Sequence, residues 1–402
     1  MYLRQEMNHM KLNKKKLARL ERLLREMVNT GFVAGVNCMV LQDGEEQCYY
    51  EAGFQDAANR IPIARDTIFR LYSMTKPITS AAVMMLLEEG KIDLLEPVSR
   101  YLPGFADQYI IKNGMMLPIS YPVTIQHLLN MTSGLVYPGE NCTAEIRTGA
   151  LIQEVTDRMP SSEPLATVEI MNRLGQLPLA FRPGERWQYG MSADVLGAVV
   201  EVASGMRFGE FLAKRIFEPL GMKDTAFYVP QDKQARLSKV YEPTPDGLKE
   251  YHGSHLAIQN RMEYEPAFES GGAGLVSTID DYKAFSQMLL QGGSFNGVTL
   301  LSPKTVEFMT GAHLTPALQD YVNQWENLPG YTYANLLRIM TDPGAAVSMG
   351  SKGEYGWDGW LGPYITNDPA DRLTLLIMQQ KTGSGTTEYT RRIRNVVFSS
   401  LD

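Results

Sequence analysis

Residues 78–87 form an apolar run, and a serine and a lysine stand directly before it. The run carries Ala, Val, Met and Leu at helical spacing, which predicts a buried helix with Ser73 and Lys76 in its first turn. Positions i and i+3 share one helix face, so the lysine amine can reach the serine hydroxyl. Burial and the partial positive charge at a helix N-terminus both favour an uncharged amine. The pair therefore places a base beside a nucleophile.

Three further segments carry motifs in a fixed order. Residues 124–135 read TIQHLLNMTSGL, residues 183–189 read PGERWQY ahead of SADVLG, and residues 271–281 read GGAGLVSTIDD. Together with Ser-x-x-Lys, they resemble the motifs of the β-lactamase-related serine hydrolases. Order and spacing agree from about residue 31 to residue 380. The chain resembles a family VIII carboxylesterase, the esterase branch nearest the class C β-lactamases.

Strand patterns near both ends of the chain enclose a long segment that has few of them. We expect strands at 36–41 and 47–52, joined by a turn at Asp43-Gly44, and at 356–363 and 373–379. We expect helices at 12–28, 275–290, 303–309 and 388–399. One sheet completed by both chain ends, with a helical insertion, would satisfy this pattern.

The resemblance implies the same fold. It is an α/β domain with an antiparallel sheet flanked by helices, of the β-lactamase and penicillin-binding-protein type, joined to a mostly helical domain. We expect the α/β domain to comprise residues 11–92 and 268–402, and the helical domain residues 93–267. The active site is expected at their junction.

The resemblance also implies catalytic roles. Tyr189 matches the catalytic tyrosine of the superfamily and would share the proton transfers with Lys76. The backbone N–H groups of Ser73 and Trp360 would form the oxyanion hole. A neutral lysine beside a phenol and an ammonium beside a tyrosinate would both serve, and the sequence leaves these coupled states open.

The third catalytic element has two candidates. Residues 381–383 read Lys-Thr-Gly, as in serine β-lactamases, but they follow a strand that resembles the one after the motif strand. The better match is Trp357-Asp358-Gly359, because family VIII esterases carry Trp-x-Gly in place of Lys-Thr-Gly. These three residues, with Met191 and Tyr137, are therefore the expected substrate-binding residues. Compared with Lys-Thr-Gly, this motif lacks the lysine cation and adds the negative charge of Asp358. The difference predicts a preference for neutral esters over anionic β-lactams.

Composition excludes several other classes of protein. The net charge of −7 and the lack of a basic patch argue against nucleic-acid binding. No uncharged run approaches the ~20 residues that span a bilayer. Three scattered cysteines suggest a reducing cytoplasm rather than a disulfide framework. We expect no cofactor and no metal, and His252 and His255 are interpreted as solvated loop residues. The sequence carries no signal for an oligomeric state.

These observations favour a serine hydrolase that cleaves neutral, short- to medium-chain carboxylic esters through an acyl-enzyme on Ser73. A β-lactamase, a D-amino acid peptidase or amidase, and an acyltransferase of the same superfamily are the alternatives. A catalytically silent binding protein on this fold is a further one. It is disfavoured because Ser73, Lys76 and Tyr189 are all retained.

Overall fold

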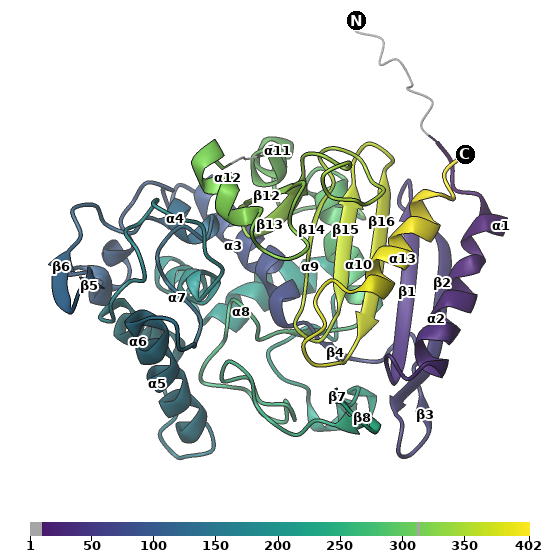
Figure 1. Ribbon diagram of the computed structural model, residues 1–402, viewed down its shortest axis with the longest axis horizontal. Helices are drawn as coiled ribbons and strands as arrows, with labels where there is room; N and C mark the ends of the chain where they lie inside the picture. Colours follow the sequence, from purple (N-terminus) through teal and green to yellow (C-terminus); the bar gives the residue numbers. More distant parts are fainter. Residues whose placement is uncertain (1–9, 312–313) are drawn as a thin grey trace, which may run out of the picture.

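The computed structural model describes residues 10–311 and 314–402, and an eight-stranded antiparallel sheet forms its centre (Figure 1). Its spatial order is β12 (Tyr331–Ala334), β13 (Leu337–Met340), β14 (Tyr355–Asp358), β15 (Tyr364–Asp368), β16 (Leu373–Gln379), β1 (Gly35–Gln42), β2 (Glu45–Asp56) and β3 (Ile61–Pro62). The first strand of the chain thus pairs with the last, in a register that joins Val36 to Gln379. The predicted closure of one sheet by both chain ends is confirmed.

The β1–β2 hairpin follows the predicted turn. Asp43 and Gly44 have φ values of +56° and +83°, the left-handed conformations that a tight hairpin turn of this kind requires. All eight residues of β1 are buried, because helices cover both faces of the sheet. Cys38 and Val40 belong to one core cluster, whereas Met39 belongs to the other.

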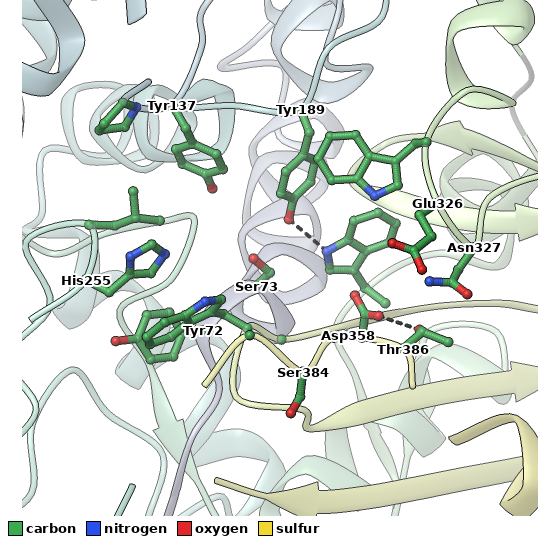
Figure 2. A pocket seen from close by; sticks show the side chains of 18 of the residues that line it. Tyr72, Ser73, Tyr137, Tyr189, His255, Glu326, Asn327, Asp358, Ser384 and Thr386 are labelled. Carbon is green, nitrogen blue, oxygen red and sulfur yellow. Dashed lines mark hydrogen bonds between the residues drawn. The ribbon is translucent and has the colours of Figure 1, made fainter. Parts of the chain in front are cut away.

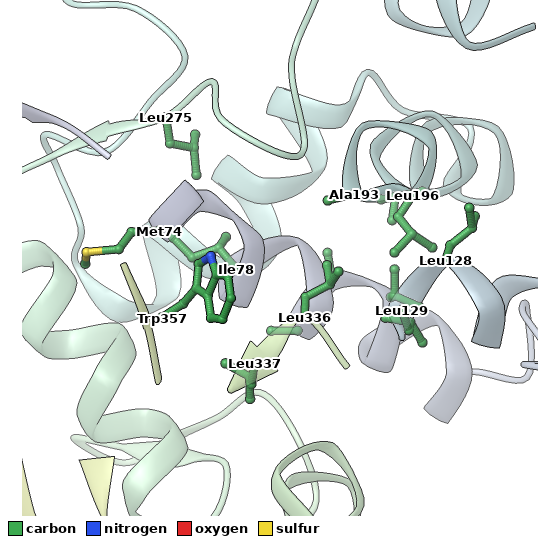
Figure 3. Packing of buried hydrophobic residues seen from close by; sticks show 14 of the residues in the cluster. Met74, Ile78, Leu128, Leu129, Ala193, Leu196, Leu275, Leu336, Leu337 and Trp357 are labelled. Carbon is green, nitrogen blue, oxygen red and sulfur yellow. The ribbon is translucent and has the colours of Figure 1, made fainter. Parts of the chain in front are cut away.

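Helices from distant parts of the sequence form these two cores. α2 (Arg19–Asn29) and α13 (Glu388–Phe398) pack together on one face. α10 (Ile279–Leu290) packs on the other face, and α3 (Lys76–Glu88) lies within the same core. Figure 3 shows side chains of this second core, including Ile78 of α3 beside Trp357 of β14.

Several predicted elements differ from the structure in their bounds. The expected helix at 12–28 is divided at Ala18 into α1 (Lys14–Leu17) and α2, and the Asn13 side chain caps α1. The expected helix at 275–290 begins only at Ile279. The residues before it form β9 (Val276–Ser277), which pairs with β4 (Phe69–Arg70) shortly before Ser73. Strands β12, β13 and β15 were not predicted.

The middle of the chain is mostly helical. Its helices are α4 (Ile125–Leu129), α5 (Thr143–Arg158), α6 (Thr167–Gly175), α7 (Ser192–Ser204), α8 (Phe208–Leu212) and α9 (Glu218–Leu220). Its strands form the hairpins β5 (Tyr109–Lys112) with β6 (Met115–Pro118) and β7 (Tyr241–Thr244) with β8 (Gly247–Glu250). This segment also has short 3₁₀ helices at Val98–Arg100, Pro103–Phe105 and Gln231–Arg236 and a π-helical turn at Ala213–Phe217, and a further 3₁₀ helix precedes it at Tyr72–Thr75.

α7 joins this segment to the rest by packing against α3. The domain boundaries at residues 93 and 267 stay a prediction. The remaining elements are β10 (Ser294–Phe295), β11 (Val298–Thr299), α11 (Pro303–Gly311) and α12 (Pro316–Val322). Among the described residues, no helix combines the length and apolar character needed to cross a bilayer.

One buried ion pair ties α13 to the sheet. Arg394 donates to both carboxylate oxygens of Glu354, at 2.7 and 2.8 Å, and to the Tyr364 hydroxyl at 2.8 Å. The side chains of Arg394 and Glu354 are only 2% and 1% exposed. Removing one member of such a pair leaves the other charge buried without its partner.

We therefore expect Glu354→Gln to lower the free energy of unfolding by about 3–5 kcal/mol. Glu307→Gln is the matched control, because Glu307 pairs with Lys304 on the surface and both side chains are mostly exposed. The control should change stability by less than about 0.5 kcal/mol. Urea denaturation of the three proteins measures both effects. Equal stabilities of Glu354→Gln and Glu307→Gln would contradict the role given to the buried pair.

Candidate active site

Ser73 lies in a short turn ahead of α3 rather than inside the helix. The turn, Tyr72–Thr75, has 3₁₀ geometry, and α3 begins at Lys76. The expectation that both residues share the first α-helical turn is therefore corrected by a few residues. Tyr72 has a φ of +45°, which is rare for a bulky residue and costs conformational energy. The Leu71 N–H bonds the Leu275 carbonyl at 2.9 Å, so pairing with the β9 segment holds this strained turn in place.

Lys76 is fully buried, with 0% of its surface exposed. Its Nζ lies 3.1 Å from Ser73 Oγ, 3.0 Å from the Tyr137 hydroxyl and 2.8 Å from the Gly272 carbonyl oxygen. Burial lowers the pKa of Lys76 from 10.5 to about 7, while Asp194 and Asp358 act in the opposite direction. The amine is thus poised to exchange a proton near neutral pH.

Tyr189 approaches from the loop that precedes α7. Gly190 lets this loop pack closely, because a Cβ there would lie 2.3 Å from the Leu135 carbonyl oxygen. The Tyr189 hydroxyl accepts a hydrogen bond from Trp357 Nε1 at 2.9 Å, and its ring centroid lies 4.6 Å from Lys76 Nζ. Burial raises the pKa of Tyr189 well above its usual value, against the opposing effect of hydrogen bonds with Ser73 and Trp357. The free enzyme therefore carries a phenol here at neutral pH.

Asp194 is a site residue that the sequence reasoning missed. It is 2% exposed, accepts hydrogen bonds from the Ser270 hydroxyl and the Gly272 N–H, and interacts electrostatically with Lys76. The N–H of Gly272 thus bonds Asp194, and its carbonyl oxygen bonds Lys76. Asp194 and Gly272 belong to the SADVLG and GGAG motifs, but the sequence does not show that these two motifs meet. The partner of the buried carboxylate is therefore recognised only in the folded structure.

The end of β14 brings the Trp-x-Gly motif to the nucleophile. A Cβ on Gly359 would lie 2.2 Å from the Leu71 carbonyl oxygen, so only glycine allows this close approach of the strand to the Ser73 segment. The backbone N–H of Trp360 meets no acceptor within residues 10–311 and 314–402. Asp358 accepts a hydrogen bond from the Thr386 hydroxyl at the edge of the cavity.

Two candidates lie elsewhere. Met191 is 1% exposed and belongs to the apolar core, and it is not among the residues that line the cavity. Lys381 follows β16, which lies two strands after β14, and its Nζ lies 3.3 Å from the centroid of the Phe32 ring. The Lys-Thr-Gly sequence thus directs its lysine away from the nucleophile.

A cavity of about 850 Å³ opens over these groups, a size typical of small-molecule sites. Figure 2 shows Ser73 at its centre, with Tyr137 and His255 on one side and Asp358, Glu326 and Asn327 on the other. Lining residues that sequence reasoning missed include Trp325, Glu326, Arg338, the loop at 383–388 and Arg391. These residues come from loops, from β13 and from α13, and none of them belongs to a motif that indicated the site.

His255 also differs from expectation. It is not a solvated loop residue: its ring stacks on Trp360, with centroids 4.1 Å apart and planes 22° apart. Burial lowers the pKa of His255 from 6.5 to about 4. His252 is indeed exposed, at 75% of its side chain. In the part of the chain that the structure describes, no three His, Cys, Asp or Glu side chains are grouped to hold a metal ion.

Comparison with known proteins decides the family. The chain matches the Beta-lactamase family over residues 20–397. It belongs to the β-lactamase family. Esterase EstB of Burkholderia gladioli is 30% identical over 401 residues, which cover 95% of each chain. The structure of EstCE1, a hydrolase with promiscuous acyltransferase activity, matches with a TM-score of 0.81 at 25% identity, covering 96% of this chain and 99% of EstCE1.

An acyltransferase is also among the relatives of this β-lactamase-family chain. Monacolin J acid methylbutanoyltransferase of Aspergillus terreus is 30% identical over 282 residues, covering 67% of this chain and 63% of that protein. The predicted resemblance to family VIII carboxylesterases and the predicted fold are both confirmed by these matches. The chain is an enzyme of the β-lactamase-related serine hydrolases, with esterase and acyltransferase homologues.

The electrostatics of Lys76 generate a pH prediction. The rate constant for labelling of Ser73 by a fluorophosphonate should rise about tenfold per pH unit and level off above about pH 7, where the amine is neutral. Asp194→Asn removes a charge that stabilises the ammonium, so the plateau should begin at a lower pH. Labelling rates measured between pH 5 and pH 9 test both statements. A plateau that moves to higher pH in Asp194→Asn would contradict them.

Proposed function

We propose that this enzyme is a serine carboxylesterase in which Ser73 forms an acyl-enzyme and Lys76 is the base that activates it. The observation that carries the proposal is the set of partners around the Lys76 amine. The Gly272 carbonyl can only accept a hydrogen bond, so one amine hydrogen points there. A neutral amine has two hydrogens and one lone pair. The hydrogens can bond the Gly272 carbonyl and the Tyr137 oxygen, and the lone pair then remains to accept the Ser73 hydroxyl proton.

The proposed proton transfers run in a fixed order through Ser73, Lys76 and Tyr189. Ser73 gives its proton to Lys76 as its oxygen attacks the ester carbonyl. The Tyr189 phenol, polarised by the hydrogen bond from Trp357, gives its proton to the leaving alcohol and recovers one from Lys76. Deacylation runs through the same groups in reverse, with water in place of the alcohol. This scheme is supported by the raised pKa of Tyr189, which disfavours a resting tyrosinate.

The oxyanion would bind to the N–H groups of Ser73 and Trp360. Support comes from the unpaired Trp360 N–H and from the tight contact of Gly359 with Leu71, which fixes the two segments relative to each other. Loss of one such donor typically costs about 3–4 kcal/mol of transition-state stabilisation.

The charges around the cavity favour a neutral substrate. Trp357 stands at the strand position where a lysine would attract an anion, and Lys381 lies against Phe32 instead. Arg338 and Arg391 line the cavity, but so do Asp358, Glu326 and Glu388. Arg338 interacts electrostatically with Asp358, and Arg391 donates to Asn327 at 2.9 Å. We therefore propose neutral esters of short to medium acyl chain as substrates.

Acyl transfer is a second candidate activity, because EstCE1 and the Aspergillus terreus enzyme both transfer acyl groups according to their names. An alcohol that enters the cavity in place of water would take the acyl group from Ser73 by the same proton route.

Removal of the nucleophile tests the proposal. Ser73→Ala should lower kcat for p-nitrophenyl butyrate by about 10⁴-fold or more and should abolish fluorophosphonate labelling. Ser384→Ala, which removes another serine of the cavity wall, should keep the labelling. Mass spectrometry of the labelled peptide identifies the modified residue. A label on any serine other than Ser73 would disprove the mechanism.

Substrate charge provides a separate test. The kcat/KM for p-nitrophenyl butyrate should exceed that for a cephalosporin carboxylate by at least about tenfold, since a lost hydrogen bond to a charged group costs about 1.5–3 kcal/mol. The methyl ester of the same cephalosporin lacks the negative charge, so its kcat/KM should lie closer to that of p-nitrophenyl butyrate. Equal efficiency on the butyrate and on the free cephalosporin would favour the β-lactamase alternative.

A further inference from the structure

The loop at 251–260 forms one wall of the cavity, on the side of Ser73 away from Asp358 (Figure 2). Leu256 and Ala257 follow His255 along this wall, and Pro138, Gly149 and Ile152 also line the cavity. We call the part of the cavity between Tyr137 and His255 the His255 arm. The imidazole of His255 therefore stands beside apolar side chains within the proposed substrate site.

This loop is held in a strained shape. Leu256 and Ala257 have φ values of +54° and +56°, and neither is a glycine. Such conformations persist only where surrounding contacts enforce them, and they concentrate at functional sites. Here the Ile258 N–H bonds the His255 carbonyl at 3.0 Å, closing the turn directly after the imidazole.

Two further contacts hold the loop, and the first joins it to the segment of Ser73. Arg70, three residues before Ser73, is buried and donates from Nε to the Asn260 carbonyl at 2.7 Å. At the other end, the Tyr251 N–H bonds the Val240 carbonyl at 2.8 Å. The position of His255 is thus defined relative to Ser73 rather than left to a free loop.

The imidazole is fixed by stacking but its nitrogens are unused. It stacks on Trp360, which carries one proposed oxyanion donor, and lies 5.9 Å from the ring of Tyr72, which precedes the other donor, Ser73. Neither ring nitrogen of His255 hydrogen-bonds any residue in the described ranges. With its pKa lowered to about 4, the ring is neutral at neutral pH and offers one acceptor and one donor.

We propose that His255 binds a hydroxyl group of the substrate, so that the enzyme selects esters hydroxylated in the part that enters the His255 arm. A half-buried polar nitrogen beside apolar walls discriminates for a ligand that satisfies it, because an analogue without the hydroxyl leaves it unpaired. The proposal rests on the carboxylesterase function. The hydroxyl can belong to the acyl group or to the alcohol, and the chemistry of recognition is the same.

Matched ester pairs and a matched variant test this. One pair is p-nitrophenyl butyrate and p-nitrophenyl 3-hydroxybutyrate, and the other is butyl butyrate and 3-hydroxybutyl butyrate. His255→Phe keeps an aromatic ring on Trp360 but removes both nitrogens. His252→Phe is the same substitution on the exposed part of the same loop. For one pair, His255→Phe should lower kcat/KM for the hydroxylated ester about fivefold more than for its deoxy partner.

The pair that responds identifies whether the hydroxyl lies on the acyl or the alcohol side. His252→Phe should leave both ratios unchanged. An active wild type in which His255→Phe slows the hydroxylated and deoxy esters equally would overturn the role of His255 alone, since a ring that only packs on Trp360 gives that result. A wild type inactive on all four esters would overturn both this inference and the proposed function.

Discussion

The burial of one lysine amine governs the arrangement of the site. Lys76 has no surface exposed to solvent, so its three neighbours must together satisfy its hydrogens and lone pair. Those neighbours come from the turn before α3, from the loop after α4 and from the segment before β9. Each of these segments must be in place before the amine can act as the base that we propose, and their contacts enforce the strained backbone at Tyr72.

The end of β14 supplies the other half of the site. Trp357 contributes in two ways that the sequence did not separate: its indole is a wall of the cavity, and its Nε1–H donates to the Tyr189 hydroxyl. A lysine at this position would offer a charge but could not provide the same flat surface. Replacing Lys-Thr-Gly by Trp-x-Gly therefore links the substrate preference that we propose to the acidity of Tyr189.

The sequence predicted the features that depend on neighbours in the chain. The β1–β2 hairpin, the helix after Ser73 and the final helix follow from local patterns, and motif order indicated Ser73, Lys76, Tyr189 and Trp357. The closure of one sheet by both chain ends was also predicted, from strand patterns near each end, but other features that depend on distant contacts were missed. The place of Asp194 in the site follows only from its hydrogen bond with the Gly272 N–H, and that of His255 only from its stacking on Trp360. The residues of strand β9 were predicted to be helical, because β9 pairs with β4, which lies about 200 residues earlier in the sequence.

The pairing of β1 with β16 also shapes how the protein matures. The Gln380 side chain, next to the end of β16, bonds the N–H and the carbonyl of Arg70, two residues 310 positions apart. A chain emerging from the ribosome at about 5–20 residues per second exposes Ser73 long before this contact can form. Contacts over such separations slow folding, because the chain must close a long loop before they contribute. The segment of Ser73 thus lacks its contact with Gln380 until about 380 residues have been made, and synthesis itself would delay the activity that we propose.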